Sequence, residues 1–363
     1  MNRTTGLILA VIAVILVAGG IYYFVTQQQE DEIAADACFI YVGPVGDFGW
    51  SYQHDQGRLE VEKELGVTTS YLESVPEGPD AERALERLAR AGCKIIFATS
   101  FGYMDQVNAV AAKFPDVKFE HATGYKREHP NVATYNSKFH EGRYVQGQIA
   151  AQMSEAGIAG YIASFPIPEV VMGINAFLLG AQSYNPDFRL KVVWANTWFD
   201  PGKEADAAKA LIDQGADIIT QHTDSTAPMQ VAAERGIKAF GQASDMIKFG
   251  PETQLTSIID DWGPYYVERV KAVMDGTWEQ VDVWAGMTEG HVVMAPYTNM
   301  PDEVKAVAEA TEAKIKSGEF NPFTGPVDKQ DGTEWLKWNE VAEDGVLLGM
   351  DFYVAGVDDK LPQ

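Results

Sequence analysis

Short apolar runs alternate with longer amphipathic stretches along most of the chain. The runs are rich in β-branched and aromatic residues and are bounded by turn-forming residues, which is typical of strands. Because strands that alternate with helices form parallel βαβ units, the pattern predicts an α/β fold built on doubly wound parallel sheets. The predicted strands are Phe39–Val42, Thr68–Leu72, Lys94–Thr99, Val117–His121, Ile158–Ala163, Lys191–Trp194, Ile218–Gln221, Lys238–Gly241 and Thr256–Ile259.

The stretches between these runs carry the signals of helix starts and stops. Asp80–Ala91 has apolar residues at helical spacing, with Pro79 just before it and Gly92 just after. Proline is favoured in the first turn of a helix and glycine directly after its end, so both boundaries are predicted. A similar helix is expected over Lys203–Gln214, ended by Gly215.

The strand and helix rhythm occurs twice, which predicts two lobes of one fold. Residues 134–156 are interpreted as a hinge followed by a helix that carries the chain into a second sheet. The strand near Thr256 and the helix over Tyr265–Met274 are expected to return to the first lobe. The predicted units are a signal or anchor segment with its linker (1–37), a first lobe (38–135 and about 256–285) and a second lobe with a C-terminal tail (136–255 and about 286–363).

The N-terminus contains a membrane signal. An uncharged, mostly apolar run extends from Leu7 to Val25, about the length that spans the hydrocarbon core as a helix. Arg3 precedes this run, so the remainder of the chain is expected to be extracytoplasmic, in the periplasm or at the cell surface. A cleaved signal peptide is the alternative, because residues 35–37 have a small-x-small form. Their distance from the apolar run favours an uncleaved anchor.

Charge excludes one class of partner. The chain has 363 residues and a formal net charge of −24. A nucleic-acid binder needs a basic surface to neutralise phosphates, and this chain has the opposite sign. We therefore expect no nucleic-acid partner.

The chain has two cysteines, Cys38 and Cys93, each at the start of a predicted strand. If those strands are neighbours in the sheet, the sulfurs can form a disulfide, which an exported domain permits. Two buried free thiols are the alternative. Neither cysteine has the partners of a catalytic or metal-bound thiol, and we expect neither a metal nor a cofactor.

Polar and aromatic side chains gather in the loops after the predicted strands. The first such loop has Asp47, Trp50 and Ser51, which offer an acceptor, a flat indole and a hydroxyl group. Ligands of open α/β sheets bind beyond the carboxyl ends of the strands, so these loops predict a binding cleft between the lobes. An indole with polar groups beside it suits a flat polar ligand. The other candidate ligand-binding residues are Phe101, Phe165, Asn175, Trp198, Asp224 and Asp245.

Catalysis is not expected. His222, Asp224 and Ser225 are the residue types of a hydrolase, but neighbours in one loop rarely point at each other as a triad must. The sequence has no G-x-S-x-G, phosphate-cradling G-x-x-x-x-G-K-[ST] or H-E-x-x-H motif. The residues therefore indicate a binding protein rather than an enzyme.

Several segments together carry a resemblance to a known family. They include YVGPVGDFGWSYQHDQGR, YLESVPEGPDAER, FPDVKFEHATGYK, ASFPIPEVVMGINAFLLGAQSYNPD and LTSIIDDWGPYY, within about residues 38–295. The chain resembles the BMP (basic membrane protein, PnrA-like) family of ABC-transporter substrate-binding proteins. That resemblance implies a type I periplasmic-binding fold, with two lobes joined by three crossovers. It also implies a ligand held between the lobes and passed to the permease of an ABC importer.

The best known members of this family bind purine nucleosides, and the resemblance extends to individual positions. Trp50 and Trp198 match family phenylalanines that stack on the two faces of the base, and Asp245 matches the acid that holds the ribose hydroxyls. Asp47 matches the acid that opens the first loop.

Two departures from the family bear on the ligand. Ser51 replaces an asparagine that reads the purine edge, and Asp260 or its neighbour stands where a lysine reaches the sugar. The departures favour a free nucleobase such as adenine over a nucleoside. Riboflavin or another small solute, a sensor for a membrane receptor and a nucleoside enzyme are the alternatives.

Overall fold

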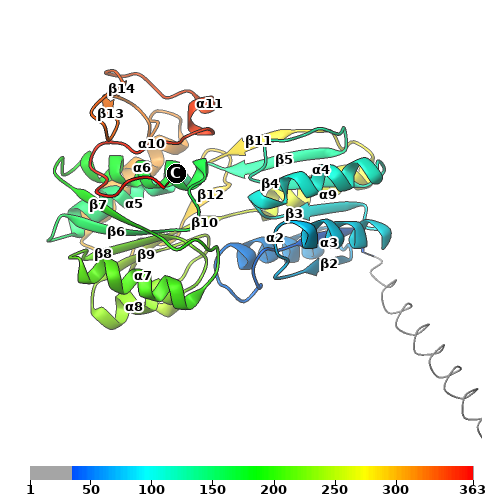
Figure 1. The fold of residues 1–363 in the computed structure, drawn as a ribbon, viewed down its shortest axis with the longest axis horizontal. Coiled ribbons are helices and arrows are strands. Elements are labelled where there is room, and N and C mark those ends of the chain that lie inside the picture. Colours follow the sequence, from blue (N-terminus) through cyan, green and yellow to red (C-terminus); the bar gives the residue numbers. More distant parts are fainter. Residues whose placement is uncertain (1–34, 363) are drawn as a thin grey trace, which may run out of the picture.

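The computed structural model describes residues 35–362. They form two lobes, each with a six-stranded sheet covered by helices on both faces, side by side along the long axis of the molecule (Figure 1). The predicted two-lobe α/β architecture is confirmed. The apolar run Leu7–Val25 lies outside the described residues. Within 35–362, no helix has the length and apolar character needed to cross a membrane.

The sheet of the first lobe is parallel throughout. Its strands are β1 (Ala37–Ile40), β2 (Thr69–Leu72), β3 (Ile95–Ala98), β4 (Lys118–Ala122), β5 (Val132–Ser137) and β11 (Asp282–Ala285), in the order β11-β5-β4-β3-β1-β2. Successive strand residues point to opposite faces, so Ile40 and Phe39 lie in different core clusters. Helices α3 (Pro79–Arg90) and α4 (Met104–Lys113) cover the face of the sheet on which Ile40 lies. Helices α2 (Trp50–Leu65) and α9 (Gly263–Asp275) cover the opposite face, on which Phe39 lies.

The second lobe repeats this plan. Its strands are β6 (Ile158–Ala163), β7 (Arg189–Trp194), β8 (Ile218–His222), β9 (Lys238–Gly241), β10 (Gln254–Asp260) and β12 (Val292–Met294), in the order β12-β10-β9-β8-β6-β7. Only β12 pairs antiparallel. Helices α5 (Phe139–Met153), α6 (Pro168–Gln182) and α10 (Asp302–Lys316) cover one face. Helices α7 (Pro201–Asp213) and α8 (Ala227–Arg235) cover the other (Figure 1).

The chain crosses between the lobes after β5, after β10 and after β11. The predicted lobe boundaries need two corrections. The strand near Thr256, expected in the first lobe, is part of β10 and belongs to the sheet of the second lobe. The first crossover lies after Ser137 rather than after residue 135, because the hinge region begins as β5, an inner strand of the first sheet. The structure has α9 and β11 in the first lobe, as predicted.

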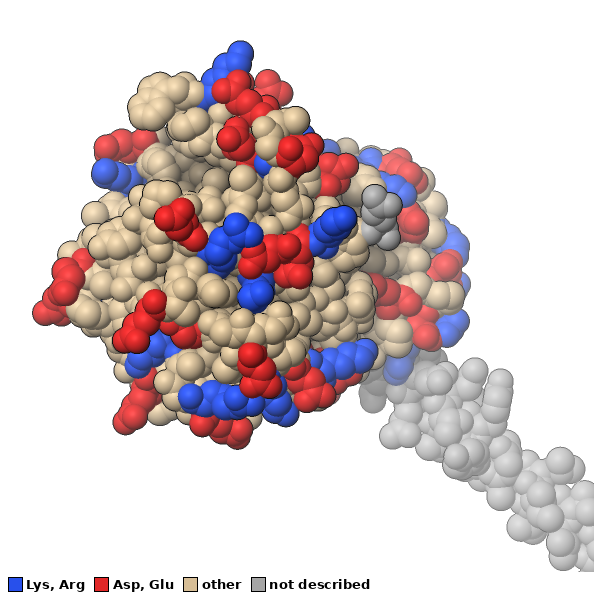
Figure 2. Space-filling view, turned by 60° about the vertical axis from the view of Figure 1, so that its left-hand side comes forward, with Lys and Arg blue, Asp and Glu red and all other residues tan. Residues whose placement is uncertain are grey.

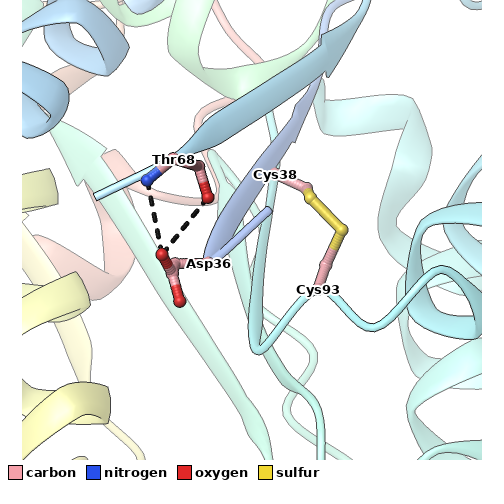
Figure 3. The surroundings of a disulfide bond; sticks show 4 residues. All are labelled: Asp36, Cys38, Thr68 and Cys93. Carbon is pink, nitrogen blue, oxygen red and sulfur yellow. Dashed lines mark hydrogen bonds between the residues drawn. A yellow bond between two sulfur atoms is a disulfide. The ribbon is translucent and has the colours of Figure 1, made fainter. Parts of the chain in front are cut away.

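Cys38 and Cys93 form a disulfide, with a Cα–Cα distance of 6.0 Å (Figure 3). Strands β1 and β3 are parallel neighbours, which brings the start of β3 beside Cys38. Of the two alternatives, the disulfide is therefore the one that the structure contains. On the neighbouring side of β1, the Asp36 carboxylate accepts hydrogen bonds from the backbone N–H and the hydroxyl group of Thr68.

The C-terminal tail folds back over the second lobe (Figure 1). It contains a two-stranded ribbon, β13 (Val327–Asp328) with β14 (Glu334–Leu336), and a short helix, α11 (Asp344–Leu347). Asn175 in α6 fixes the end of the tail: its Nδ2 donates to the Phe352 carbonyl at 2.8 Å, and its Oδ1 accepts from the Val354 N–H at 3.0 Å. The tail therefore moves with the second lobe as one body.

Charged side chains of both signs are interspersed on the face of the molecule that Figure 2 shows. On the face in Figure 2, Lys and Arg side chains stand beside Asp and Glu rather than gathering in one basic patch. A nucleic acid would find no continuous row of cations on this face.

Candidate functional site

A cavity lies between the lobes, and we call it the central cavity; its empty space measures about 340 Å³, including the part open to solvent. The first lobe contributes residues that follow β1, β3 and β4, and the second contributes residues near the carboxyl ends of its own strands. The lining residues are Val42, Trp50, Ser100, Phe101 and Thr123 from the first lobe, and Glu169, Trp198, His222, Asp224 and Gln242 from the second. Four predicted site residues, Trp50, Phe101, Trp198 and Asp224, come together here.

Trp50 is fixed in one orientation. Its indole N–H donates to the Thr99 carbonyl at 2.7 Å, and its ring packs edge-on against His54 and Trp262. Only 9% of the residue is exposed. The first lobe therefore offers a rigid aromatic wall whose polar atom is already satisfied.

Trp198 comes from the opposite lobe. Its indole N–H lies 3.4 Å from Oε1 of Glu77 in the first lobe, and its ring packs at a steep angle on Phe165, with centroids 5.1 Å apart. Phe165 lines a neighbouring opening together with Trp198, but it is not part of the wall of the central cavity. Phe165 therefore packs against the Trp198 indole and supports it from outside the central cavity.

The loop that holds Asp47 and Ser51 organises the start of α2. The Asp47 carboxylate accepts hydrogen bonds from the N–H groups of Gly49, Ser51 and Tyr52 at 2.8–3.0 Å, and Ser51 Oγ accepts from Gly43 N–H at 3.1 Å. Neither side chain lines the central cavity. The structure thus gives both residues a different task from the one predicted, because the backbone of this loop uses their polar atoms.

The same loop brings the lobes into contact. Ser244 Oγ donates to the Phe48 carbonyl, and Lys248 Nζ lies 3.5 Å from the centroid of the Phe48 ring. At Gly49 the backbones approach so closely that an added Cβ would lie 2.8 Å from the Asp224 Cα. The two lobes therefore touch through main-chain atoms beside the cavity.

Asp224 is the most strongly perturbed group of the cavity wall. Its pKa is raised well above the usual range by burial, and next by the neighbouring carboxylates of Asp47 and Glu204. Burial also raises the pKa of Asp47 to about 6, although three N–H donors oppose that rise. The backbone N–H of Trp50 donates to the Asp224 carboxyl group. Oδ2 of Asp224 is buried and has no partner among the described residues, so this oxygen is available to a ligand.

Glu169 and His222 are cavity residues that the sequence reasoning did not select. Glu169 lies in the cavity wall with Oε1 3.6 Å from His222 Nε2. Burial lowers the pKa of His222, so its imidazole is neutral at pH 7. Glu169 follows directly on the loop after β6, so the strand-end rule could have found it.

Two other predicted residues lie elsewhere. Asn175 is fully buried and holds the C-terminal tail, as described above. The Asp245 carboxylate accepts from Ile247 N–H at 3.0 Å and from Gln254 Nε2 at 2.7 Å, outside the cavity wall. Protein atoms use both polar ends of the Asn175 amide, and Asp245 is an exposed residue whose two hydrogen bonds both fall on Oδ1.

The hydrolase-type residues are not arranged as a triad. Ser225 Oγ donates to Glu204 at 2.7 Å rather than to His222, while His222 faces Glu169. Within residues 35–362, no cluster of His, Cys, Asp and Glu could hold a metal ion.

Two lobes with a shared cavity at their strand ends define a substrate-binding protein of the periplasmic-binding type. The chain belongs to the family of PnrA-like ABC transporter substrate-binding proteins, whose model matches residues 34–321. The predicted family is therefore confirmed. Its members are named as binding proteins rather than enzymes.

Two relatives and one solved structure that are similar to this chain are also named as binding proteins. A Brucella abortus protein named as a purine-binding protein is 71% identical over 90% of this chain and 93% of its own length. A Haloferax volcanii protein named as a candidate glucose-binding protein of an ABC transporter is 38% identical over 90% of this chain and 81% of its own. A solute-binding protein from Aeropyrum pernix shares the fold, with a TM-score of 0.70 at 21% identity, covering 78% of this chain and 92% of that one.

Proposed function

We propose that this substrate-binding protein captures a purine-type ligand, with a free base such as adenine preferred, in the central cavity. The observation that carries the proposal is the combination of two indoles, one from each lobe, with a buried carboxyl oxygen that has no partner within residues 35–362. Stacking on aromatic rings contributes about 1–3 kcal/mol per base face. The name of the Brucella relative supports the same ligand class.

Asp224 offers the base a polar contact. Burial raises the pKa of its carboxyl group well above the usual range, and its Oδ2 has no partner among the described residues. This oxygen can form a hydrogen bond with the polar edge of a purine. The preference for a free base over a nucleoside rests on Asp260 or its neighbour, which stands where a lysine of the family reaches the sugar.

We propose that closure of the lobes completes the site and creates the surface that the permease subunits of the ABC transporter recognise. The contacts at Phe48, Gly49 and Ser244 support this step, since they exist only when the lobes touch. The apolar run Leu7–Val25 supports attachment of the protein to the outer face of the cytoplasmic membrane. Binding, not turnover, is the proposed activity.

Isothermal titration with adenine, guanine, hypoxanthine and adenosine tests the ligand class. Riboflavin and glucose test the alternatives, the second because of the name of the Haloferax relative. Binding of a sugar or of riboflavin without any purine overturns the proposal. Two matched variants test the contact: Asp224→Asn keeps a donor and an acceptor and should keep adenine affinity, whereas Asp224→Ala should lose it. Equal affinity in the two variants contradicts the role given to Asp224.

A further inference from the structure

A second, larger cavity adjoins the central one, and we call it the tail cavity. It measures about 1450 Å³, including the part open to solvent. Phe101, Thr123 and Glu169 line both cavities, so the two spaces meet at these side chains. The two cavities therefore lie on either side of these side chains, and a substituent that points toward them from the central cavity is directed at the tail cavity.

The C-terminal tail builds one wall of this cavity. Asp344, Gly345, Leu348 and Gly349 face lobe 1 residues near β5 and β11, among them Trp284. The tail lies beyond residues 34–321, which are those that the family model matches. This wall is thus an addition to the shared family core.

The wall is firmly attached to the second lobe. Asn175 holds the chain at Phe352 and Val354, and Gln182 Nε2 donates to the Ala355 carbonyl at 3.1 Å. Leu347 and Met350, which flank the lining residues Leu348 and Gly349 in the chain, are buried in the core of the second lobe. The tail therefore forms a preformed surface, and the cavity needs no ordering step to accept a ligand group.

The side chains that line the tail cavity are mostly apolar or acidic, which determines the ligand groups that can bind there. Ile167, Met172, Val283, Trp284 and Leu348 provide apolar contact. The charged lining residues are all acidic, namely Glu169, Asp282 and Asp344. Two cations lie near these residues without lining the cavity: Arg127 pairs with Asp282 at 2.9 Å, and Lys138 Nζ lies 5.1 Å from the centroid of the Trp284 ring. A phosphate group in the cavity would therefore contact carboxylates, whereas an apolar group can pack on the apolar side chains and an amine can pair with the carboxylates.

We propose that the tail cavity is a subsite for a substituent on the purine, and that the substituent is uncharged or cationic and largely apolar. This inference rests on the proposed purine function of the central cavity. The protein then selects substituted purines as well as the free base, and rejects nucleotides. The tail, rather than the family core, sets this part of the specificity.

Calorimetry with the purified protein tests the subsite, using adenine, N6-benzyladenine, 9-benzyladenine and AMP. We expect adenine and one of the two benzyl isomers to bind with affinities within about tenfold of each other, and AMP to show no binding. The two isomers are both needed because either ring position can face the shared wall. If adenine binds and neither benzyl isomer does, the subsite is overturned while the purine function stands. If no purine binds, the proposed function fails, and the subsite with it.

Variants locate the substituent. A Cβ at Gly345 meets no atom within 4 Å, so Gly345→Trp has room to fill the cavity that this residue lines, and Leu348→Ala removes an apolar contact. Both variants should lower the affinity for the benzyl isomer by at least about fivefold. Their affinity for adenine should stay within about twofold of the wild-type value, because large groups in a pocket discriminate by steric exclusion. Val346→Trp is the matched control, since Val346 is exposed on the same short helix outside the lining. Unchanged benzyl affinity in both cavity variants overturns the subsite.

Discussion

Replacing Gly49 by alanine should weaken ligand binding without destabilising the ligand-free protein. The added Cβ would lie 2.8 Å from the Asp224 Cα and 2.9 Å from its carbonyl carbon, and closer still to the oxygen. All three are main-chain atoms of the opposite lobe, so no side chain can rotate away. Restoring the 3.4 Å of ordinary contact to the Cα alone requires the lobes to separate by about 0.6 Å.

The magnitude follows from the cost of such overlap. Overpacking by one carbon costs about 1–3 kcal/mol, and here the cost falls on the closed state only. Because ligand binding draws on closure, the affinity for adenine should fall about 5- to 150-fold. The melting temperature without ligand should stay within about 1 °C, since open lobes have no overlap.

Calorimetry of adenine binding and thermal melts of the free protein are the assays. Gly46→Ala is the matched control: it lies in the same loop, and its Cβ would meet nothing within 4 Å. Wild-type affinity in Gly49→Ala refutes the reasoning. So does an equal loss in Gly46→Ala, because the effect would then come from the loop rather than from contact with Asp224.

Three further predictions follow from the site and the core. Trp198→Ala should weaken adenine binding about 5- to 150-fold, from a stacking contribution of about 1–3 kcal/mol, with an unchanged circular dichroism spectrum; unchanged affinity contradicts the stacking role. Burial raises the pKa of Asp47 from 3.8 to about 6, so the folded protein keeps this proton longer than the unfolded chain, and unfolding free energy is lost as the pH rises from about 4 to about 6. The pKa of Asp224 is also raised by burial, so Asp224→Asn removes a second group of this kind, and urea titrations should show a smaller loss over that window than in the wild type; equal losses would argue against a raised pKa at Asp224. Replacing Cys38 and Cys93 by alanine opens a loop of 55 residues and should lower the unfolding free energy by about 4 kcal/mol; a change below about 1 kcal/mol speaks against a stabilising disulfide.

The fold was largely predictable because its strands are short apolar runs with clear boundaries. Each predicted strand is present, with ends displaced by a few residues. The sequence did not reveal β5, β11 and β12 as strands. Strands β11 and β12 lie at sheet edges, where one side meets solvent and the apolar pattern weakens, whereas β5 is an inner strand whose residues VATYNS include several polar ones. Strand β10 was assigned to the wrong lobe, since sequence order does not say which sheet a strand joins after a crossover.

The site was predictable only as far as the strand-end rule reaches. That rule identified Trp50, Trp198 and Asp224, because position alone brings them to the cleft. It failed for Asp47, whose carboxylate is used by three N–H groups of its own loop. Asn175, another predicted contact, lies inside α6 rather than at a strand end. Its partners lie more than 170 residues away in the tail, a separation that no local pattern reveals.

The edge strands have a consequence for making fragments of this protein. Strand β11 covers the edge of β5, and β12 covers the edge of β10, yet both come from residues 282–294, late in the chain. A product that stops before residue 282 leaves the edges of both sheets uncovered, and open strand edges pair with other chains. Neither lobe can therefore be obtained by a single cut. Truncated chains should aggregate, and each lobe should become competent to fold only when nearly the whole polypeptide has been made.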